Sequence, residues 1–219
     1  MKAFITGSSK GLGKALATVF ASHGHSVFLH GRSEADLTKL SRELNCGHIC
    51  HDLADVSGIG TLHDYLRKHE IDVLINNAAI YQGYSDDPVA VARLINTNLT
   101  SGILLMKGFY DYRKSLGGGA IVNINSVAGV YPNAKEAFYC ASKFGLTGFV
   151  QSMQEKCSFD NIRVYEYFFG GITTKMTEHR ADHKLLIDPA EAAQLIYHNL
   201  TSYTSLCSLS QKVKRLRYN

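Results

Sequence analysis

The stretch KAFITGSSKGLG at residues 2–13 joins a short apolar run to three closely spaced glycines. After it the apolar residues change to helical spacing at Leu16, Val19 and Phe20, which predicts a strand, a glycine turn and a helix. Glycines let a backbone turn tightly and approach a ligand, and the first N–H groups of a helix can bind a phosphate. The stretch therefore predicts a dinucleotide-binding turn, with a glycine loop that holds no ligand as the alternative.

The rest of the chain continues the alternation of strand and helix. Apolar runs predict further strands at residues 26–30, 47–50, 71–75, 120–124 and 163–168, and a candidate seventh strand at 205–209. Helical spacing predicts helices that include 88–114, with a break before Asn96, 138–156 and 189–200. Ser33 would cap the helix after the second strand. The pattern predicts an α/β fold with a doubly wound, Rossmann-like parallel sheet, in which residues 1–219 form a single domain.

The composition describes one globular domain. The chain has 219 residues, of which 45% are hydrophobic and 19% charged, enough for a continuous core but not for a second full domain. The formal net charge of +4 is modest, and the basic residues are spread out except in the tail at Lys212, Lys214, Arg215 and Arg217. We expect this tail to be a solvated chain end, and we expect no nucleic-acid partner.

Local features indicate where the protein resides. Met1 and Lys2 run directly into the first strand without the core of a signal peptide, and no apolar run approaches the ~18 residues of a membrane span. Five cysteines without framework spacing suit a reducing compartment. We therefore expect a cytoplasmic protein with no membrane partner.

Two short segments raise the question of a metal site. Residues 46–51 contain two cysteines and two histidines, but they are predicted to form a buried strand and lack a second ligand pair. His179 and His183 lie four residues apart without an acidic partner, and we interpret them as solvated helix histidines. We expect no metal.

Polar residues follow several of the predicted strands. Asp52 and Leu53 come after the third strand, Asn76 and Asn77 after the fourth, and Ser126 after the fifth. Ligands bind at the carboxyl ends of the strands in open parallel sheets, so these residues are candidates for a binding edge. For the asparagine pair, ordinary turn chemistry is an equal alternative.

Tyr139 and Lys143 lie four residues apart in the helix predicted at 138–156. Side chains at this spacing share a helix face, so the ammonium of Lys143 would lower the pKa of the Tyr139 phenol and let it exchange a proton. The spacing also suits an aromatic residue on a packing face beside a solvated lysine. Asn98 is a poor helix former inside helix 88–114, which suits either a functional role or a buried structural amide.

These motifs together resemble the short-chain dehydrogenase/reductase family over nearly the whole chain. The glycine turn of residues 6–13 is similar to the cofactor turn of that family, and Asp52-Leu53 to its adenine-side motif. Residues 76–79 are similar to its Asn-Asn-Ala-Gly, with Ala79 in place of the glycine. The residues that match its catalytic tetrad are Asn98, Ser126, Tyr139 and Lys143.

The resemblance implies hydride transfer between a nicotinamide cofactor and a carbonyl or secondary alcohol. Ser126 would hydrogen-bond the substrate oxygen, and Tyr139 would exchange its proton as general acid or base. Lys143 would hold the nicotinamide ribose, and Asn98 would position a water that links Lys143 to solvent. The cofactor contacts that the resemblance implies are Gly7, Ser9, Lys10, Gly11, Leu12, Gly13, Arg32, Asp52, Leu53, Asn77, Ala78, Tyr139, Lys143, Gly170, Ile172 and Thr174.

Two cations favour NADP(H) as the cofactor. An NAD-preferring enzyme places a carboxylate at the end of the second strand, whereas this chain has Gly31 followed by Arg32. Arginine suits a phosphate in two-point contact, and Lys10 in the glycine turn adds a second charge on the same expected side. With no opposing carboxylate expected, this arrangement predicts a preference for the 2′-phosphate of NADP(H).

The leading interpretation is an NADPH-dependent carbonyl reductase that acts on a small-molecule carbonyl or alcohol. A non-enzymatic NADP(H)-binding regulatory protein is one alternative, but it would not need an intact tetrad. An epimerase or dehydratase with the same Tyr–Lys pair is the other, although such relatives usually carry a larger carboxy-terminal domain. Candidates for the pocket wall, which would favour an apolar or aromatic carbonyl, are Tyr81, Tyr131, Phe169 and His179.

Two departures from the family pattern bear on the pocket. Phe169 replaces the family proline after the sixth strand, so its ring either stacks near the cofactor or fills space. The segment 174–187 is short for a substrate lid, so we expect a pocket that is open or completed by a neighbouring subunit. The helices at 99–114 and 138–156 carry apolar residues on more than one face, which predicts a homodimer or homotetramer.

Overall fold

The computed structural model describes residues 1–83, 85–202 and 209–215. These residues form a seven-stranded parallel sheet in the order β3-β2-β1-β4-β5-β6-β7. The strands are β1 Lys2–Ile5, β2 Ser26–Gly31, β3 Gly47–Cys50, β4 Val73–Asn76, β5 Gly119–Ser126, β6 Ile162–Phe169 and β7 Ser210–Val213. The order reverses between β1 and β4, as in a doubly wound Rossmann-like sheet, so the predicted fold class is confirmed.

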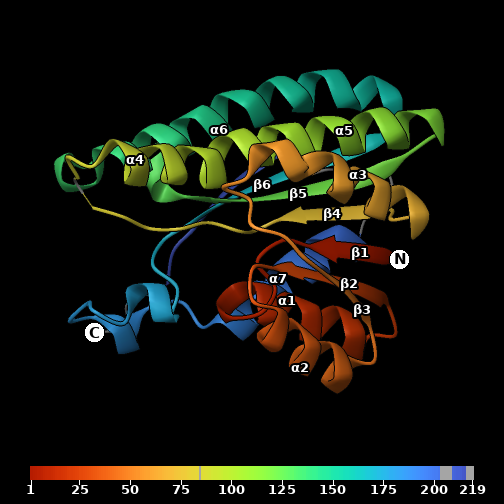
Figure 1. Ribbon diagram of the computed structural model, residues 1–219, viewed down its shortest axis with the longest axis horizontal. Coiled ribbons are helices and arrows are strands. Elements are labelled where there is room, and N and C mark those ends of the chain that lie inside the picture. The colour runs from red at the N-terminus through yellow and green to blue at the C-terminus, as the bar shows by residue number, and fades with distance from the viewer. Residues whose placement is uncertain (84, 203–208, 216–219) are drawn as a thin grey trace.

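Helices cover both faces of this sheet (Figure 1). One face carries α1 Gly11–Ser22, α2 Glu34–Leu44 and α7 Pro189–Thr201. The other carries α3 Ile59–Lys68, α4 Pro88–Ile95, α5 Ser101–Ser115 and α6 Ala137–Cys157. Each face has its own apolar core, because a parallel sheet between two helical layers is buried on both sides. Along β6, Tyr165 and Tyr167 pack in the core of the first face, and Val164 packs in that of the second.

The predicted strands are confirmed with small changes in their bounds. The fourth begins at Val73 instead of residue 71, and the fifth and sixth continue to Ser126 and Phe169. The seventh strand is β7, whereas the predicted positions 205–208 lie outside the described residues. Ser33 caps α2 as expected, since its hydroxyl accepts a hydrogen bond from the Asp36 N–H at 3.4 Å.

The break predicted before Asn96 is a wide turn inside one continuous helix. A π-helical segment, Asn96–Thr100, joins α4 to α5. The combined helix has 28 residues and a mean hydropathy of 1.3 over its most apolar window, so by length and composition it could span a membrane. The expectation that no segment approaches this length is therefore wrong. Core helices of soluble proteins meet the same criterion, and Leu105 and Phe109 of this helix are fully buried in the core.

Candidate active site

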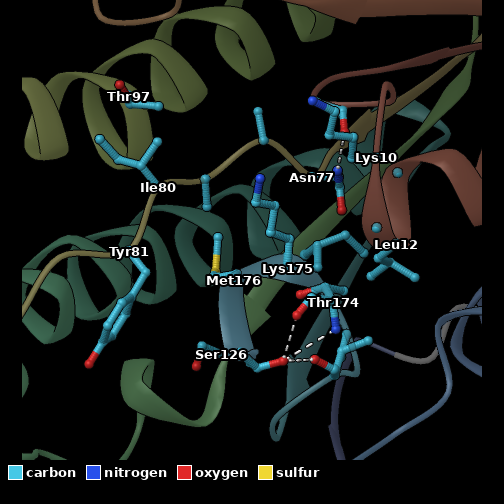
Figure 2. A pocket seen from close by; sticks show the side chains of 18 of the residues that line it. Lys10, Leu12, Asn77, Ile80, Tyr81, Thr97, Ser126, Thr174, Lys175 and Met176 are labelled. Carbon is cyan, nitrogen blue, oxygen red and sulfur yellow. Dashed lines mark hydrogen bonds between the residues drawn. The ribbon is translucent and has the colours of Figure 1, made fainter. Parts of the chain in front are cut away.

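A large cavity opens at the carboxyl ends of the strands. Its volume is about 1000 Å³, and it is lined by the turn after β1, the ends of β2, β5 and β6, and the segments after β3 and β4. Figure 2 shows Asn77, Ile80 and Tyr81 along one wall, with Lys175 and Met176 pointing toward it. All sixteen residues implied as cofactor contacts line this cavity, as does Ser126. Their role in binding stays a prediction.

The glycine turn packs against the segment after β4 too closely for side chains. Gly7 and Gly11 have φ angles of 64° and 54°, a conformation that favours glycine. A Cβ atom on Gly13 would lie 2.2 Å from the Gly7 carbonyl oxygen. Asn77 secures this contact, since its Nδ2 donates to the Thr6 carbonyl at 2.8 Å. Asn77 thus holds the turn in shape from the neighbouring strand.

Lys10 has a carboxylate partner at the Arg32 end of the cavity. Its Nζ lies 2.8 Å from Oδ2 of Asp36, in the first turn of α2. The hydrogen bond from Lys10 lowers the pKa of Asp36, so the carboxylate is charged. The expectation of no opposing carboxylate is therefore wrong. The end of β2 is Gly31 and carries no carboxylate, whereas α2 supplies one from its first turn.

Asp52 and Leu53 reach the cavity from the end of β3. The carboxylate of Asp52 accepts hydrogen bonds from the Ala54 N–H at 3.0 Å and from Arg93 at 2.6 Å. Burial disfavours its charge, but the two hydrogen bonds and the charges of Arg93 and Arg32 together outweigh burial and lower the pKa of Asp52. Arg93 of α4 is therefore a partner of the site that the sequence analysis did not identify.

Ser126, Tyr139 and Lys143 converge beside the cavity. Ser126 ends β5, and the other two lie one turn apart on α6. The Ser126 hydroxyl accepts from the Ala128 N–H at 3.1 Å and lies close enough to the Tyr139 phenol to lower its pKa. The Nζ of Lys143 lies 5.8 Å from the Tyr139 ring centroid and donates to the Ile124 carbonyl at 3.4 Å. Tyr139 is 9% exposed and Lys143 2%, so the structure brings these two groups together in an almost dry site.

Burial governs the protonation of both groups. It raises the pKa of Tyr139 to about 12, and the Ser126 hydroxyl opposes this only in part. Burial also lowers the pKa of Lys143 to about 8, against the effect of the Glu166 charge. The expectation of a lowered pKa for Tyr139 is wrong in this structure, because burial is the largest effect on the phenol and raises its pKa. The phenol keeps its proton at neutral pH and is suited to donate it.

Asn98 lies in the π-helical segment and is 1% exposed. Its Oδ1 accepts from the Ile80 N–H at 2.8 Å, and its Nδ2 donates to the Ile80 carbonyl at 2.8 Å and to Ser142 at 3.4 Å. Both ends of the amide are thus used to join the segment after β4 to the helices. Asn98 is therefore a buried amide with a structural role, which was the alternative considered for it, and its role in positioning a water stays a prediction.

Phe169 and Thr174 complete the cavity after β6. Phe169 is 2% exposed, and its ring stacks on Tyr167 at 5.9 Å between centroids. It therefore fills space in the core while also contributing to the cavity wall. Thr174 lies against the glycine turn, since a Cβ on Gly11 would be 3.1 Å from its Cγ2.

Tyr81 and His179 form the wall next to Tyr139. The Tyr81 ring meets Tyr139 edge-on at 5.3 Å between centroids and stacks on His179 at 6.0 Å. The Tyr81 hydroxyl donates to Glu136 at 3.1 Å, and burial followed by this hydrogen bond raises the pKa of Tyr81. Glu136 also lines the cavity, and the sequence analysis missed it because no motif contains it.

Tyr131 is not part of the cavity wall. It is 51% exposed, and its ring lies under the ammonium groups of Lys212 and Lys214 at 5.1 Å and 5.6 Å from the centroid. Its assignment to the pocket wall is therefore wrong. Both lysines are exposed, as expected for the tail, although Lys212 lies in β7, which brings this part of the chain back over the turn that follows β5.

Among the described residues, no group of three or more His, Cys, Asp and Glu side chains could hold a metal ion. Cys50, at the end of β3, is exposed. The two histidines interpreted as solvated helix residues do not lie in an α-helix. His179 stacks on the Tyr81 ring, and His183 lies in a 3-10 turn beside Thr177.

Comparisons with known proteins agree with this geometry. The family model for short chain dehydrogenase matches residues 1–185. Carbonyl reductase family member 4 of Danio rerio is 32% identical over 220 residues, which cover 91% of each chain. The 3-oxoacyl-[acyl-carrier-protein] reductase of Thermotoga maritima is 31% identical over 188 residues, or 80% of this chain and 75% of that protein.

Solved structures of the same fold are also similar. A metagenomic short-chain oxidoreductase in complex with NADP has a TM-score of 0.83 at 28% identity, covering 99% of this chain and 98% of its own. A short-chain dehydrogenase from Sphingobium yanoikuyae in complex with NADPH has a TM-score of 0.87 at 25% identity, covering 96% and 87%. The chain therefore belongs to the short-chain dehydrogenase/reductase family of oxidoreductases.

Proposed function

We propose that this protein is an NADPH-dependent carbonyl reductase that converts a small-molecule carbonyl to a secondary alcohol in the cytoplasm. The observation that carries the proposal is the buried phenol of Tyr139, which keeps its proton and lies with Ser126 in the wall of a cavity that can hold a dinucleotide. A buried phenol with a raised pKa is a proton donor, which is what reduction of a carbonyl requires. The carbonyl reductase among its relatives supports the same activity.

The cavity fits a dinucleotide. The turn at Gly7 and Gly13 leaves no room for side chains, and it leads into the amino terminus of α1, where N–H groups can bind phosphate. Lys10 and Arg32 place two cations at one end of the cavity, which supports NADP(H). The structures with NADP and NADPH bound agree with this choice.

The bound cofactor supplies the hydride, and the protein supplies position and a proton. Ser126 donates a hydrogen bond to the substrate oxygen and holds the carbonyl against Tyr139. The Tyr139 hydroxyl gives its proton to the oxygen as negative charge develops there. Lys143 holds the nicotinamide ribose, and its ammonium stabilises the phenolate that remains. Tyr81 and His179 form the wall of the cavity beside Tyr139.

We also propose a homodimer or homotetramer. Leu104 of α5 is 39% exposed and Phe144 of α6 is 43% exposed. Large apolar side chains on two neighbouring helices give a surface that a second copy can cover.

The test is a screen of NADPH oxidation with ketones, aldehydes, quinones and acyl-thioester ketones, followed by Tyr139→Phe on the best substrate. Loss of one general acid should lower kcat about 100-fold or more, with little change in NADPH affinity. Tyr112→Phe on α5, away from the cavity, is the matched control and should leave kcat unchanged. Near-normal turnover by Tyr139→Phe would show the mechanism to be wrong.

A further inference from the structure

A carboxyl group is fully buried between the sheet and α6. Glu166 of β6 is 0% exposed and lies opposite Asn123 of β5. The positions on either side of it that point the same way, Val164 and Phe168, are apolar and buried. A buried charge is unfavourable unless it is hydrogen-bonded or paired, so this position calls for a specific explanation.

Glu166 accepts two hydrogen bonds on one oxygen. Its Oε1 accepts from Asn125 Nδ2 at 2.8 Å and from Asn123 Nδ2 at 3.2 Å. The amide oxygen of Asn123 accepts in turn from Asn76 of β4 at 2.8 Å. The other oxygen, Oε2, is buried and has no hydrogen-bond partner among the described residues. The network therefore crosses three neighbouring strands near their carboxyl ends.

Asn125 connects this network to the active site. Its Nδ2 donates to the Lys143 carbonyl at 3.3 Å and to Thr147 at 3.0 Å, as well as to Glu166. Its Oδ1 accepts from the Ser126 N–H at 2.8 Å. A carboxylate accepts hydrogen bonds and does not donate them, so Glu166 decides which way the amide faces. With Nδ2 turned to Glu166, Oδ1 must face Ser126.

We propose that Glu166 is a positioning residue, which orients Asn125 and thereby holds Ser126 and Lys143 in place, and whose negative charge helps to keep Lys143 protonated. The proposal rests on the proposed function. Among the residues that the structure describes, Asn125 is the only side chain that hydrogen-bonds the backbones of both Ser126 and Lys143.

The charges agree with this role. Burial raises the pKa of Glu166 to about 7, and the hydrogen bonds from Asn125 and Asn123 oppose the rise. Burial lowers the pKa of Lys143 to about 8, and the Glu166 charge opposes the fall. Near neutral pH each group therefore favours the charged form of the other.

Two variants separate orientation from charge. Glu166→Leu removes the acceptor for Asn125, and kcat should fall about tenfold or more, since small displacements of catalytic groups are costly. Glu166→Gln keeps an acceptor oxygen, so kcat below neutral pH should stay within about threefold of the parent protein. Without the negative charge Lys143 loses its proton at lower pH, so the alkaline decline in activity should begin at lower pH. An unchanged kcat in Glu166→Leu would overturn the role of Glu166 in orienting Asn125. An unchanged pH profile in Glu166→Gln would overturn the role of its charge.

A double-mutant cycle tests whether Glu166 acts through Asn125. In a protein that already carries Asn125→Ala, adding Glu166→Leu should lower kcat by less than about twofold, because the residue that Glu166 orients is already absent. If the two substitutions lower kcat by independent factors that multiply in the double variant, the proposal is overturned. Gln154→Leu is the matched control. It removes another buried amide between α6 and β6, which donates to the Val164 carbonyl at 3.2 Å, and it should lower stability without changing kcat.

Unfolding of the cofactor-free protein gives a readout that needs no substrate. The pKa of Glu166 rises from 4.5 to about 7 on folding, so its contribution to stability is present below pH 4.5 and is lost as pH rises toward 7. Glu166→Gln should remove this loss and flatten the pH dependence of stability in that range. If the stability of the parent protein and that of Glu166→Gln change equally with pH in this range, the proposed buried charge is overturned. If the slopes differ but no carbonyl is reduced by the parent protein, the proposed function fails and the buried charge stands.

Discussion

Replacement of Arg32 should reduce the preference for NADPH over NADH. A hydrogen bond to a charged group contributes about 1.5–3 kcal/mol, and because Arg32 is exposed we take about 1.5 kcal/mol. Since about 1.4 kcal/mol corresponds to a factor of ten, Arg32→Ala should lower the ratio of the two affinities about tenfold. Lys10→Ala should lower it less, because Asp36 already neutralises part of the Lys10 charge.

The assay is a titration of the protein with each cofactor at low and at high salt. Higher salt should weaken NADPH binding more than NADH binding, because it screens the contact with the 2′-phosphate. Lys14→Ala is the matched control, since Lys14 lies on α1 shortly after Lys10 and pairs with Glu43 of α2 at 3.3 Å but does not line the cavity. The reasoning is refuted if Arg32→Ala leaves the ratio unchanged, or if the parent protein binds NADH as tightly as NADPH.

Two further predictions follow from packing. Gly13→Ala should abolish cofactor binding in a titration and lower the Tm, because the new Cβ would meet the Gly7 carbonyl at 2.2 Å; Gly60→Ala, with nothing within 4 Å, is the control and should leave both unchanged or raise the Tm. Binding by Gly13→Ala at the affinity of the parent protein would contradict this. Light scattering at micromolar concentration should give the mass of a dimer or tetramer, and Leu104→Asp should lower that mass; a monomer before any substitution would contradict the assembly.

The sheet and most of the site could be predicted from the sequence because they depend on local patterns. Apolar runs separated by helical spacing define the strands, and the carboxyl ends of parallel strands necessarily meet at one edge. This alone predicts that Ser126 and Asn77 lie near the glycine turn. The spacing of Tyr139 and Lys143 then places both on one face of α6.

The features that could not be predicted depend on contacts between distant segments. Asp36 reaches Lys10 only because α2 packs beside the turn, and the lysines of the tail reach Tyr131 only because β7 pairs with β6. The sequence predicts a break before Asn96 but not that the break is a π-helical turn, which directs Asn98 toward Ile80. Protonation is the hardest case, because helix spacing gives the position of an ammonium but not how much water the fold removes.

Burial of the site also decides the protonation state of its groups. β5 and α6 hold Tyr139 and Lys143 by packing them in a dry interface, and the loss of solvent favours the neutral form of each. A neutral phenol is the donor that carbonyl reduction needs, whereas alcohol oxidation needs a phenolate. With the pKa of Tyr139 raised to about 12, the phenol carries its proton at neutral pH, which is the form from which carbonyl reduction starts. At Lys143, where the ammonium is needed, the charge of Glu166 opposes the same loss of solvent. A carboxyl group is therefore useful at a strand position that packing alone would give to an apolar side chain.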